Sequence, residues 1–273
     1  MRTRGFTLVE LVMVIMVTSI IAASITVFFK PAIDSYFDTR RRADLTDLAD
    51  TALRRMTQDI RRAVPNSIRS VSATCFQLVP TIAGGRYRMA SDTVNDTAPL
   101  PCAPSATCSA PLDASTGVAT VFDVLSPLPT APAVGDWIVI NNQNGGDVYA
   151  GTNRGAITAI ALPARTTDGL HRITAAVPVS TGYYGGRFVA VTNAEQTVFY
   201  SCVGTVLYRT LAAFNANQAT TCASTSGAIV ATDVASCTFA DSADQGFLRL
   251  RLTLSRAGES VSLAHGVHVS NVP

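Results

Sequence analysis

The chain has 273 residues, of which 48% are hydrophobic and only 15% are charged, enough for one large domain or two small ones with a substantial core. Its 21 basic and 19 acidic side chains give a formal net charge of +2, and two of the basic ones, Arg2 and Arg4, lie within the first five positions. The remainder is formally neutral and carries no basic stripe beyond one helix, which excludes nucleic acid as an expected partner.

Residues 1–30 join a short basic leader to a long apolar run. The run from Leu11 to Phe29 is 19 residues long, about enough to span a bilayer as a helix. No cleavage site of the ordinary secretory kind follows it. Its polar residues carry hydroxyl groups that are able to bond back to their own helix: Thr18, Ser19, Ser24 and Thr26. We therefore expect a helix that stays in the membrane.

A single carboxylate, Glu10, stands at the start of this run. Placing it in lipid costs about 2–3 kcal/mol. Either the side chain lies at the level of the lipid head groups, or it pairs with a cation. Cleavage after Gly5 would supply one, because the new amine of Phe6 would lie four residues away along the helix.

The segment from Gly5 through Phe6 to Glu10, between a basic leader and an apolar helix, resembles the class III signal of type IV prepilins and type II secretion pseudopilins. The resemblance implies that a prepilin peptidase cleaves between Gly5 and Phe6 and N-methylates Phe6. A glycine at the cleavage site leaves the backbone open to the enzyme. The family also implies that Glu10 pairs with the amine of Phe6 in its own or a neighbouring subunit, since two charges that are costly alone in an apolar bundle are tolerable together.

The same resemblance implies the partners and the location. The partners are the prepilin peptidase, the inner membrane, and other major and minor pilins that pack through their N-terminal helices. The basic leader is expected on the cytoplasmic side. The chain would then cross the inner membrane once, with its C-terminal domain in the periplasm, and later reach a pilus or the cell surface.

The composition becomes charged and amphipathic beyond Lys30 and Pro31, where we expect the helix to bend rather than stop. The apolar positions form one helical stripe: Leu45, Leu48, Ala52, Met56, Ile60 and Ala63. The charged residues are expected to face elsewhere: Asp44, Asp47, Asp50, Arg54, Arg55, Asp59, Arg61 and Arg62. Pro65 predicts a helix end near Val64. The run 40–42 of three arginines is either a solvated face or a contact with lipid or a partner.

Short strands and turns follow from residue 68. The segment 134–140 predicts a strand, and 197–209 predicts a hairpin that turns near Val203 and Gly204. Strict alternation over 248–255 predicts a strand with one apolar face, followed by a turn and a last strand at about 260–269. The stretch 89–117 is expected to be a long irregular loop, which we call the excursion.

These elements predict an α+β fold, with a long N-terminal helix packed on an antiparallel sheet as in type IV pilins. We divide the chain into a leader (1–5), a transmembrane and assembly helix (6–30), an amphipathic helix (31–64) and a β-rich periplasmic or extracellular domain (65–273).

The cysteines all lie beyond residue 70 and form no CxxC pair: Cys75, Cys102, Cys108, Cys202, Cys222 and Cys237. An even number in an exported domain predicts disulfides, against six buried thiols as the alternative. Pairing by the shortest loops would join Cys102 to Cys108 and Cys202 to Cys222, and would leave Cys75 for Cys237. The other pairings remain open.

We find no hydrolase elbow, phosphate-binding loop or zinc-protease motif, and we expect no catalytic residues, metal or cofactor. His265 and His268 would point to opposite faces of a strand. The turn between Asp241 and Gly246 lacks the calcium-loop pattern and is expected to be solvated.

The terminal segment LRLTLSRAGESVSLAHGVHVSNVP, with PNSIR, AGGRYR and GDWIVI, resembles the MshO-type minor pilins of mannose-sensitive haemagglutinin (MSHA) pilus clusters. This resemblance implies a minor subunit that enters a pilus or primes its assembly. The J-type minor pseudopilins of type II secretion share the layout and an LYR-like hairpin, and are the first alternative. The second is a filament-tip adhesin or ligand-binding module that uses 89–117 or 141–155.

Overall fold

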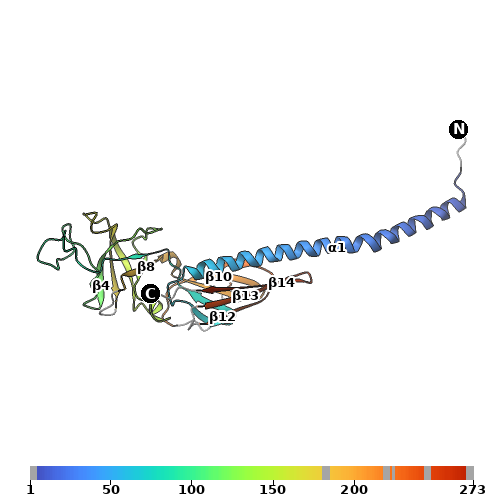
Figure 1. Cartoon of the computed structure of the whole chain (residues 1–273). Coiled ribbons are helices and arrows are strands. Elements are labelled where there is room, and N and C mark those ends of the chain that lie inside the picture. Colours follow the sequence, from blue (N-terminus) through green and yellow to red (C-terminus); the bar gives the residue numbers. More distant parts are fainter. Residues whose placement is uncertain (1–4, 180–184, 218–221, 223–224, 243–246, 269–273) are drawn as a thin grey trace.

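One long helix, α1 (Leu8–Arg61), dominates the computed structural model, which describes residues 5–179, 185–217, 222, 225–242 and 247–268 (Figure 1). The helix continues through Pro31, so this proline does not stop it, as expected. Its cap is Arg62, three residues before Pro65. The N-terminal half projects away from the rest of the molecule, whereas the C-terminal half lies on strands.

The apolar stripe of α1 is buried, as the sequence predicts. Leu45, Ala52, Met56 and Ile60 are at most 1% exposed and belong to a core shared with the neighbouring sheets. One predicted position is wrong: Asp59 faces this core rather than the solvent. It lies seven residues beyond Ala52, two full turns along the same stripe.

Two antiparallel sheets cover the C-terminal half of α1, and we call this part the proximal domain. The five-stranded sheet has the order β1-β2-β9-β10-β11, with β1 (Arg69–Ser72), β2 (Cys75–Leu78), β9 (Thr197–Val203), β10 (Val206–Ala212) and β11 (Ala228–Ala231). The three-stranded sheet comprises β12 (Val234–Ser242), β13 (Phe247–Arg256) and β14 (Glu259–His268). The predicted hairpin at 197–209 and the alternating strand at 248–255 are both confirmed.

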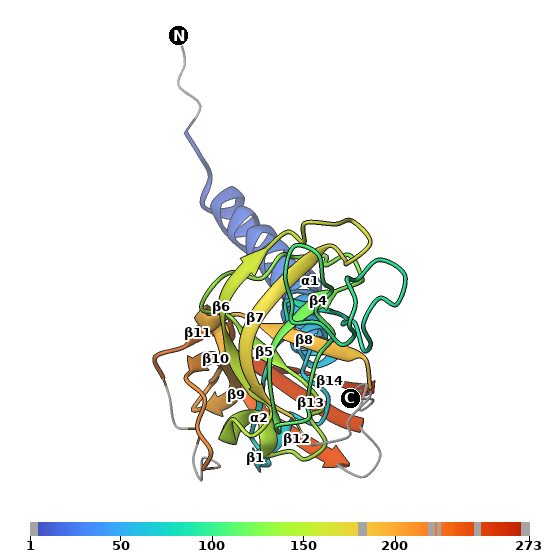
Figure 2. The same cartoon turned by 90° about the vertical axis from the view of Figure 1, so that its left-hand side faces the viewer.

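A second, distal part is built from the residues between β2 and β9. Its sheet has the order β3-β8-β5-β6-β7-β4, with β3 (Ala83–Arg86), β8 (Arg187–Val191), β5 (Trp137–Val139), β6 (Arg154–Ala161), β7 (His171–Pro178) and β4 (Val118–Val124). The two outer strands meet, because Leu125 N donates to Arg86 O at 2.9 Å and Arg88 N donates to Asp123 O at 2.9 Å. The sheet therefore closes into a barrel with a core of its own (Figure 2).

The barrel lies beyond the C-terminal end of α1, at the opposite end of the molecule from the N-terminus (Figure 1). Two short helices accompany it, α2 (Asp147–Ala150) and η1 (Asn193–Glu195). A small third cluster, which includes Val64, Val79, Val139 and Tyr149, joins the helix end to the barrel. The predicted strand at 134–140 is β5, which has three residues.

Three disulfides pair all six cysteines. The Cys102–Cys108 pair agrees with the expectation from loop length. The other two expected pairs are wrong, because Cys75 bonds to Cys222 and Cys202 bonds to Cys237. The Cys202–Cys237 disulfide joins β9 to β12, so spatial proximity between the two proximal sheets, and not the shortest loop, decides this pairing.

The α+β fold with a long N-terminal helix on antiparallel sheets is confirmed. The excursion at 89–117 contains no helix or strand and carries one disulfide. The turn between Asp241 and Gly246, considered above for calcium, falls largely outside the described residues, as do the leader arginines Arg2 and Arg4.

Candidate functional site

Residues 5–7 form no helix or strand and lead directly into α1. Gly5 and Phe6 precede α1, and Phe6 is 74% exposed. Thr7 caps the helix by accepting a hydrogen bond from Glu10 N at 3.3 Å. A Cβ added at Gly5 would meet no atom within 4 Å, so the space beside this residue is open.

The first 30 residues of α1 touch no other part of the described chain closely enough to be covered. All residues from 5 to 37 are exposed, and most of those up to Phe29 are apolar. At 1.5 Å per residue the exposed part is roughly 45 Å long, which exceeds the hydrocarbon thickness of a bilayer. Among the described residues, α1 is the one helix long and apolar enough to cross a membrane.

The hydroxyl groups in this apolar run are satisfied within the helix. The Thr18 hydroxyl donates to Val14 O at 2.8 Å, and the Ser19 hydroxyl donates to Ile15 O at 2.7 Å. The Ser24 hydroxyl donates to Ile20 O at 2.8 Å. Thr26 does the same with Ala22 O at 2.9 Å. These bonds confirm the expected back-bonding, which removes most of the cost of placing the hydroxyl groups in an apolar environment.

Glu10 lies in the first turn of α1, where the helix dipole favours a negative charge. Its side chain is exposed, and within the described part of the chain no basic group pairs with it. The dipole is worth at most about 1 kcal/mol at an exposed site, less than the cost of placing a carboxylate in lipid. The helix dipole alone therefore does not offset the cost of a charged Glu10 among apolar groups.

The arginine run at 40–42 is only partly available to partners. Arg41 pairs with Asp38 at 2.8 Å, one turn earlier, and Arg42 pairs with Glu259 at the start of β14. Exposed pairs of this kind contribute little stability. The Arg42–Glu259 contact nevertheless places the β13–β14 hairpin against α1 where the helix leaves the proximal domain.

A buried polar network fixes the opposite end of α1 to the five-stranded sheet. The Asp59 carboxylate accepts from Tyr200 Oη at 2.8 Å and from Arg209 Nε at 2.9 Å. Arg209 also donates to both carboxylate oxygens of Glu195, at 3.0 and 3.1 Å. The charge pattern of the sequence did not predict this network, although the spacing of seven residues between Ala52 and Asp59 places Asp59 on the buried face.

Two members of this network, Arg209 and Tyr200, keep one protonation state over the physiological range. Burial alone would lower the pKa of Arg209, but its hydrogen bonds to Glu195 and Asp59 raise it above its usual value. Burial and the neighbouring Asp59 carboxylate raise the pKa of Tyr200. Arg209 therefore stays charged and Tyr200 stays neutral, so that the hydroxyl always has a proton to donate to Asp59.

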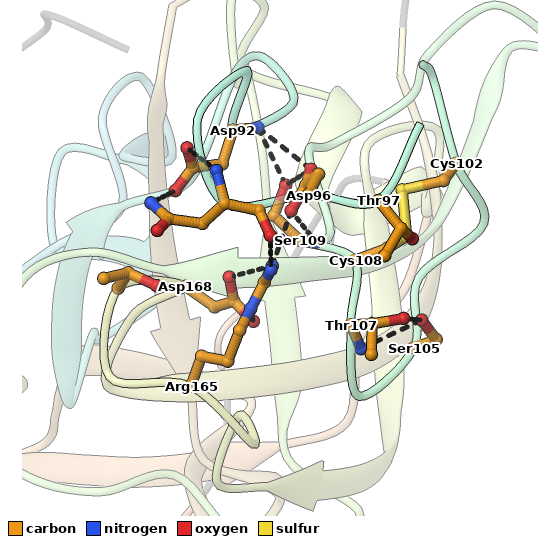
Figure 3. A network of polar contacts seen from close by, with 12 residues as sticks. Asp92, Asp96, Thr97, Cys102, Ser105, Thr107, Cys108, Ser109, Arg165 and Asp168 are labelled. Atoms are coloured by element: carbon orange, nitrogen blue, oxygen red, sulfur yellow. Dashed lines mark hydrogen bonds and ion pairs between the residues drawn. A yellow bond between two sulfur atoms is a disulfide. The ribbon is translucent and has the colours of Figure 1, made fainter. Parts of the chain in front are cut away.

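A second polar network holds the excursion at 89–117 against the barrel (Figure 3). Arg165 bridges Asp96 at 2.5 Å and Asp168 at 2.7 Å, and both carboxylates are at most 1% exposed. Ser109 donates to Asp96 through its hydroxyl and its backbone amide. Burial alone would raise the pKa of Asp96, but the hydrogen bonds from Ser109 and Arg165 lower it well below its usual value.

Arg172, on β7, extends this network to the disulfide of the excursion. It bonds to both oxygens of the buried Asp123 carboxylate, at 2.7 and 2.9 Å, and donates to Ser105 O and Cys108 O. The excursion is thus ordered by arginines from the barrel and not by secondary structure. No group of three metal-ligating side chains occurs in the part of the chain that the structure describes.

Residues 1–26 match the family model described as the prokaryotic N-terminal methylation motif. The match supports a type IV pilin-like or pseudopilin subunit, and the motif implies processing by a prepilin peptidase and assembly with other pilin-like chains. It includes Gly5, Phe6 and Glu10, and is consistent with anchoring by a single N-terminal span. No curated protein and no solved structure matches the chain.

Proposed function

We propose that this chain is a minor pilin-like subunit that enters a type IV filament of the MSHA type or primes its assembly. In this proposal the prepilin peptidase cleaves between Gly5 and Phe6, Phe6 is N-methylated, and the exposed half of α1 anchors the subunit in the inner membrane. The proximal domain and the barrel then lie in the periplasm, and later on the pilus or the cell surface.

The observation that carries the proposal is the position of the methylation motif on α1. The motif covers residues 1–26, and residues 5–37 are exposed and mostly apolar up to Phe29. A bare apolar helix of this length needs lipid or other helices around it, because exposure to water would cost about 25 cal/mol per Å² of apolar surface. Transfer from bilayer to helix bundle keeps that surface covered throughout assembly.

Glu10 gives the bundle its register in this proposal. An unpaired carboxylate among packed apolar helices is costly, and the amine of a processed Phe6 is the counter-charge that cleavage creates. Pairing between neighbouring subunits would then favour one axial offset over others. The cost of a mismatched offset is the loss of a charge-assisted hydrogen bond at both partners.

Two alternative functions remain, a minor pseudopilin and a filament-tip adhesin, and each has an observation that would favour it. A J-type minor pseudopilin would have the same N-terminus, and is favoured if the gene lies among secretin-dependent export genes rather than pilus genes. A filament-tip adhesin would use the distal barrel, which lies far from the membrane helix. Shortening the excursion at 89–117 or the loop at 141–155 should then abolish attachment while filaments persist; unchanged attachment would exclude this role for the loop concerned.

Processing is tested by mass analysis of the mature protein from a strain that contains the peptidase. We expect the N-terminus to be a methylated Phe6. A bulky residue at position 5 should block cleavage more strongly than Gly5→Ala, which adds only a methyl group. An intact Met1 terminus in the wild-type protein would refute the proposed processing.

Assembly is tested with Glu10→Ala, for which Asp34→Ala is the matched control. Both residues are exposed carboxylates on α1, but Asp34 lies beyond the apolar run. We expect Glu10→Ala to be cleaved normally yet to enter filaments poorly, as seen by immunoblotting of sheared pili. Incorporation equal to that of the control would contradict the charge-pair argument.

A further inference from the structure

A cleft of about 510 Å³ separates the end of α1 from the outer face of the barrel. Its apolar wall comes from Val64 and Pro65 after the helix and from Val139 and Val189 on β5 and β8. This volume lies within the range of small-molecule sites in proteins. Residues from both parts of the molecule form the cleft, a place where ligand sites are common.

Two arginines on neighbouring strands, Arg86 and Arg187, line the cleft side by side. Arg86 on β3 and Arg187 on β8 are directly opposite in the antiparallel ladder, so their side chains leave the same face of the sheet. Like charges at such a position repel and destabilise the pair. Within the described residues neither guanidinium has an acidic partner, and no acidic residue lines the cleft. The local charge is therefore uncompensated.

Two further polar groups at the cleft have unused hydrogen-bonding capacity. Ser126 Oγ accepts from Arg86 N at 2.8 Å, which leaves the hydroxyl proton without an acceptor among the described residues. Asn141 has a left-handed backbone with φ of 57°, and its Oδ1 is buried without a hydrogen bond from the described residues. The neighbouring Asn142, by contrast, bonds to Pro65 O and accepts from Val148 N.

We propose that this cleft binds a small hydroxylated organic acid, the chemistry of an acidic sugar. Its carboxylate would lie between Arg86 and Arg187, where two guanidinium groups and the Ser126 hydroxyl all donate to oxygen. Asn141 lines the cleft, and a rotation of its side chain would bring the buried Oδ1 to a hydroxyl of the ligand. The C–H groups of the ligand would cover the valine and proline wall. The bound anion replaces the repulsion between the arginines by attraction, so the affinity depends on both charges.

The test uses the full chain in detergent micelles, titrated with glucuronic acid, glucose and inorganic phosphate. Binding is followed by ligand-observed NMR and by the shift of the melting temperature. The double variant Arg86→Gln/Arg187→Gln removes the site, and Arg249→Gln/Arg251→Gln removes the same charge from the exposed face of β13 as the matched control. We expect saturable binding of glucuronic acid that weakens at least about tenfold in the first variant and is unchanged in the second.

Glucose should not bind, since it lacks the carboxylate, and phosphate should bind more weakly than glucuronic acid, since it offers no hydroxylated body to the apolar wall and Asn141. Without ligand, the Arg86→Gln/Arg187→Gln variant should melt at the same temperature as the wild type or higher, because the repulsion is gone. Failure of glucuronic acid to saturate, an unaffected double variant, or phosphate binding as tight as that of glucuronic acid would each overturn the proposal.

Discussion

Replacing Asp59 by alanine tests whether the buried network holds α1 on the proximal domain. The Asp59 side chain is 12% exposed and that of Arg209 is 10% exposed, so water screens their interaction poorly. The substitution removes the acceptor of two hydrogen bonds, from Tyr200 and from Arg209. Both donors are then left in a largely buried site.

The expected loss in the free energy of unfolding depends on which hydrogen bonds Arg209 keeps after the substitution. Breaking a buried ion pair by removing one partner costs about 3–5 kcal/mol. Arg209 keeps its two bonds to Glu195, so we expect a value at the lower end of that range, about 3 kcal/mol. For a chain of this size such a loss lowers the melting temperature by roughly 6–12 °C. Asp59→Asn should cost less, because its side-chain oxygen still accepts from Tyr200.

Thermal unfolding of the full chain in detergent, together with hydrogen exchange, measures this effect. Exchange should accelerate in peptides from 45–60 and 197–212, and stay unchanged in barrel peptides from 154–178. Asp50→Ala is the control, since Asp50 pairs with Arg54 on the solvent side of the same helix, and it should cost less than about 1 kcal/mol. Equal effects of the two substitutions would refute the argument that burial makes Asp59 important.

Despite its burial, Asp96 has a pKa that hydrogen bonds hold below its usual value. Asp96 therefore stabilises the folded barrel above about pH 4, and this stabilisation is lost as the pH falls further. Acid unfolding should show this loss, and Asp96→Asn should make the free energy of unfolding depend less on pH. Replacing Cys75 and Cys222 by serine opens a loop of 147 residues and should lower the free energy of unfolding by about 5 kcal/mol by the chain-entropy estimate. Replacing Cys102 and Cys108, which close a loop of six residues, should lower it by about 2 kcal/mol. Chemical denaturation measures both losses. Gly155→Ala would place a Cβ 2.1 Å from Ala176 O and should destabilise the β6–β7 pairing by about 1–3 kcal/mol, seen as faster hydrogen exchange in β7 with no change in α1.

Local patterns in the sequence predicted the elements with strong periodicity. The 3.6-residue spacing of Leu45 to Ile60 predicted the buried stripe of α1, and the alternation over 248–255 predicted β13. The hairpin at 197–209 followed from a turn at Gly204, which has a φ of 59°. Each of these features depends on residues close together in the chain, and the backbone period alone determines which side chains share a face.

The position of Asp59 shows where such reasoning fails. A charged residue on a helix is usually solvated, and only the presence of Tyr200 and Arg209, about 140 and 150 residues later in the chain, makes its burial tolerable. The closed barrel is similar. Its strands are short, and the contact between Leu125 and Arg86 that closes it has no local sequence signature.

The sequence by itself determined the features that lie along one helix: the methylation motif over residues 1–26, the single carboxylate of Glu10 within it, and an apolar run long enough to cross a membrane. Tertiary structure alone decided which cysteines pair, that a barrel extends the molecule beyond the helix, and that Arg86 and Arg187 lie side by side on neighbouring strands at a cleft. The physical reason is range. Membrane insertion depends on a continuous apolar stretch of chain, whereas disulfides, barrel closure and charge pairs depend on residues that only folding brings together.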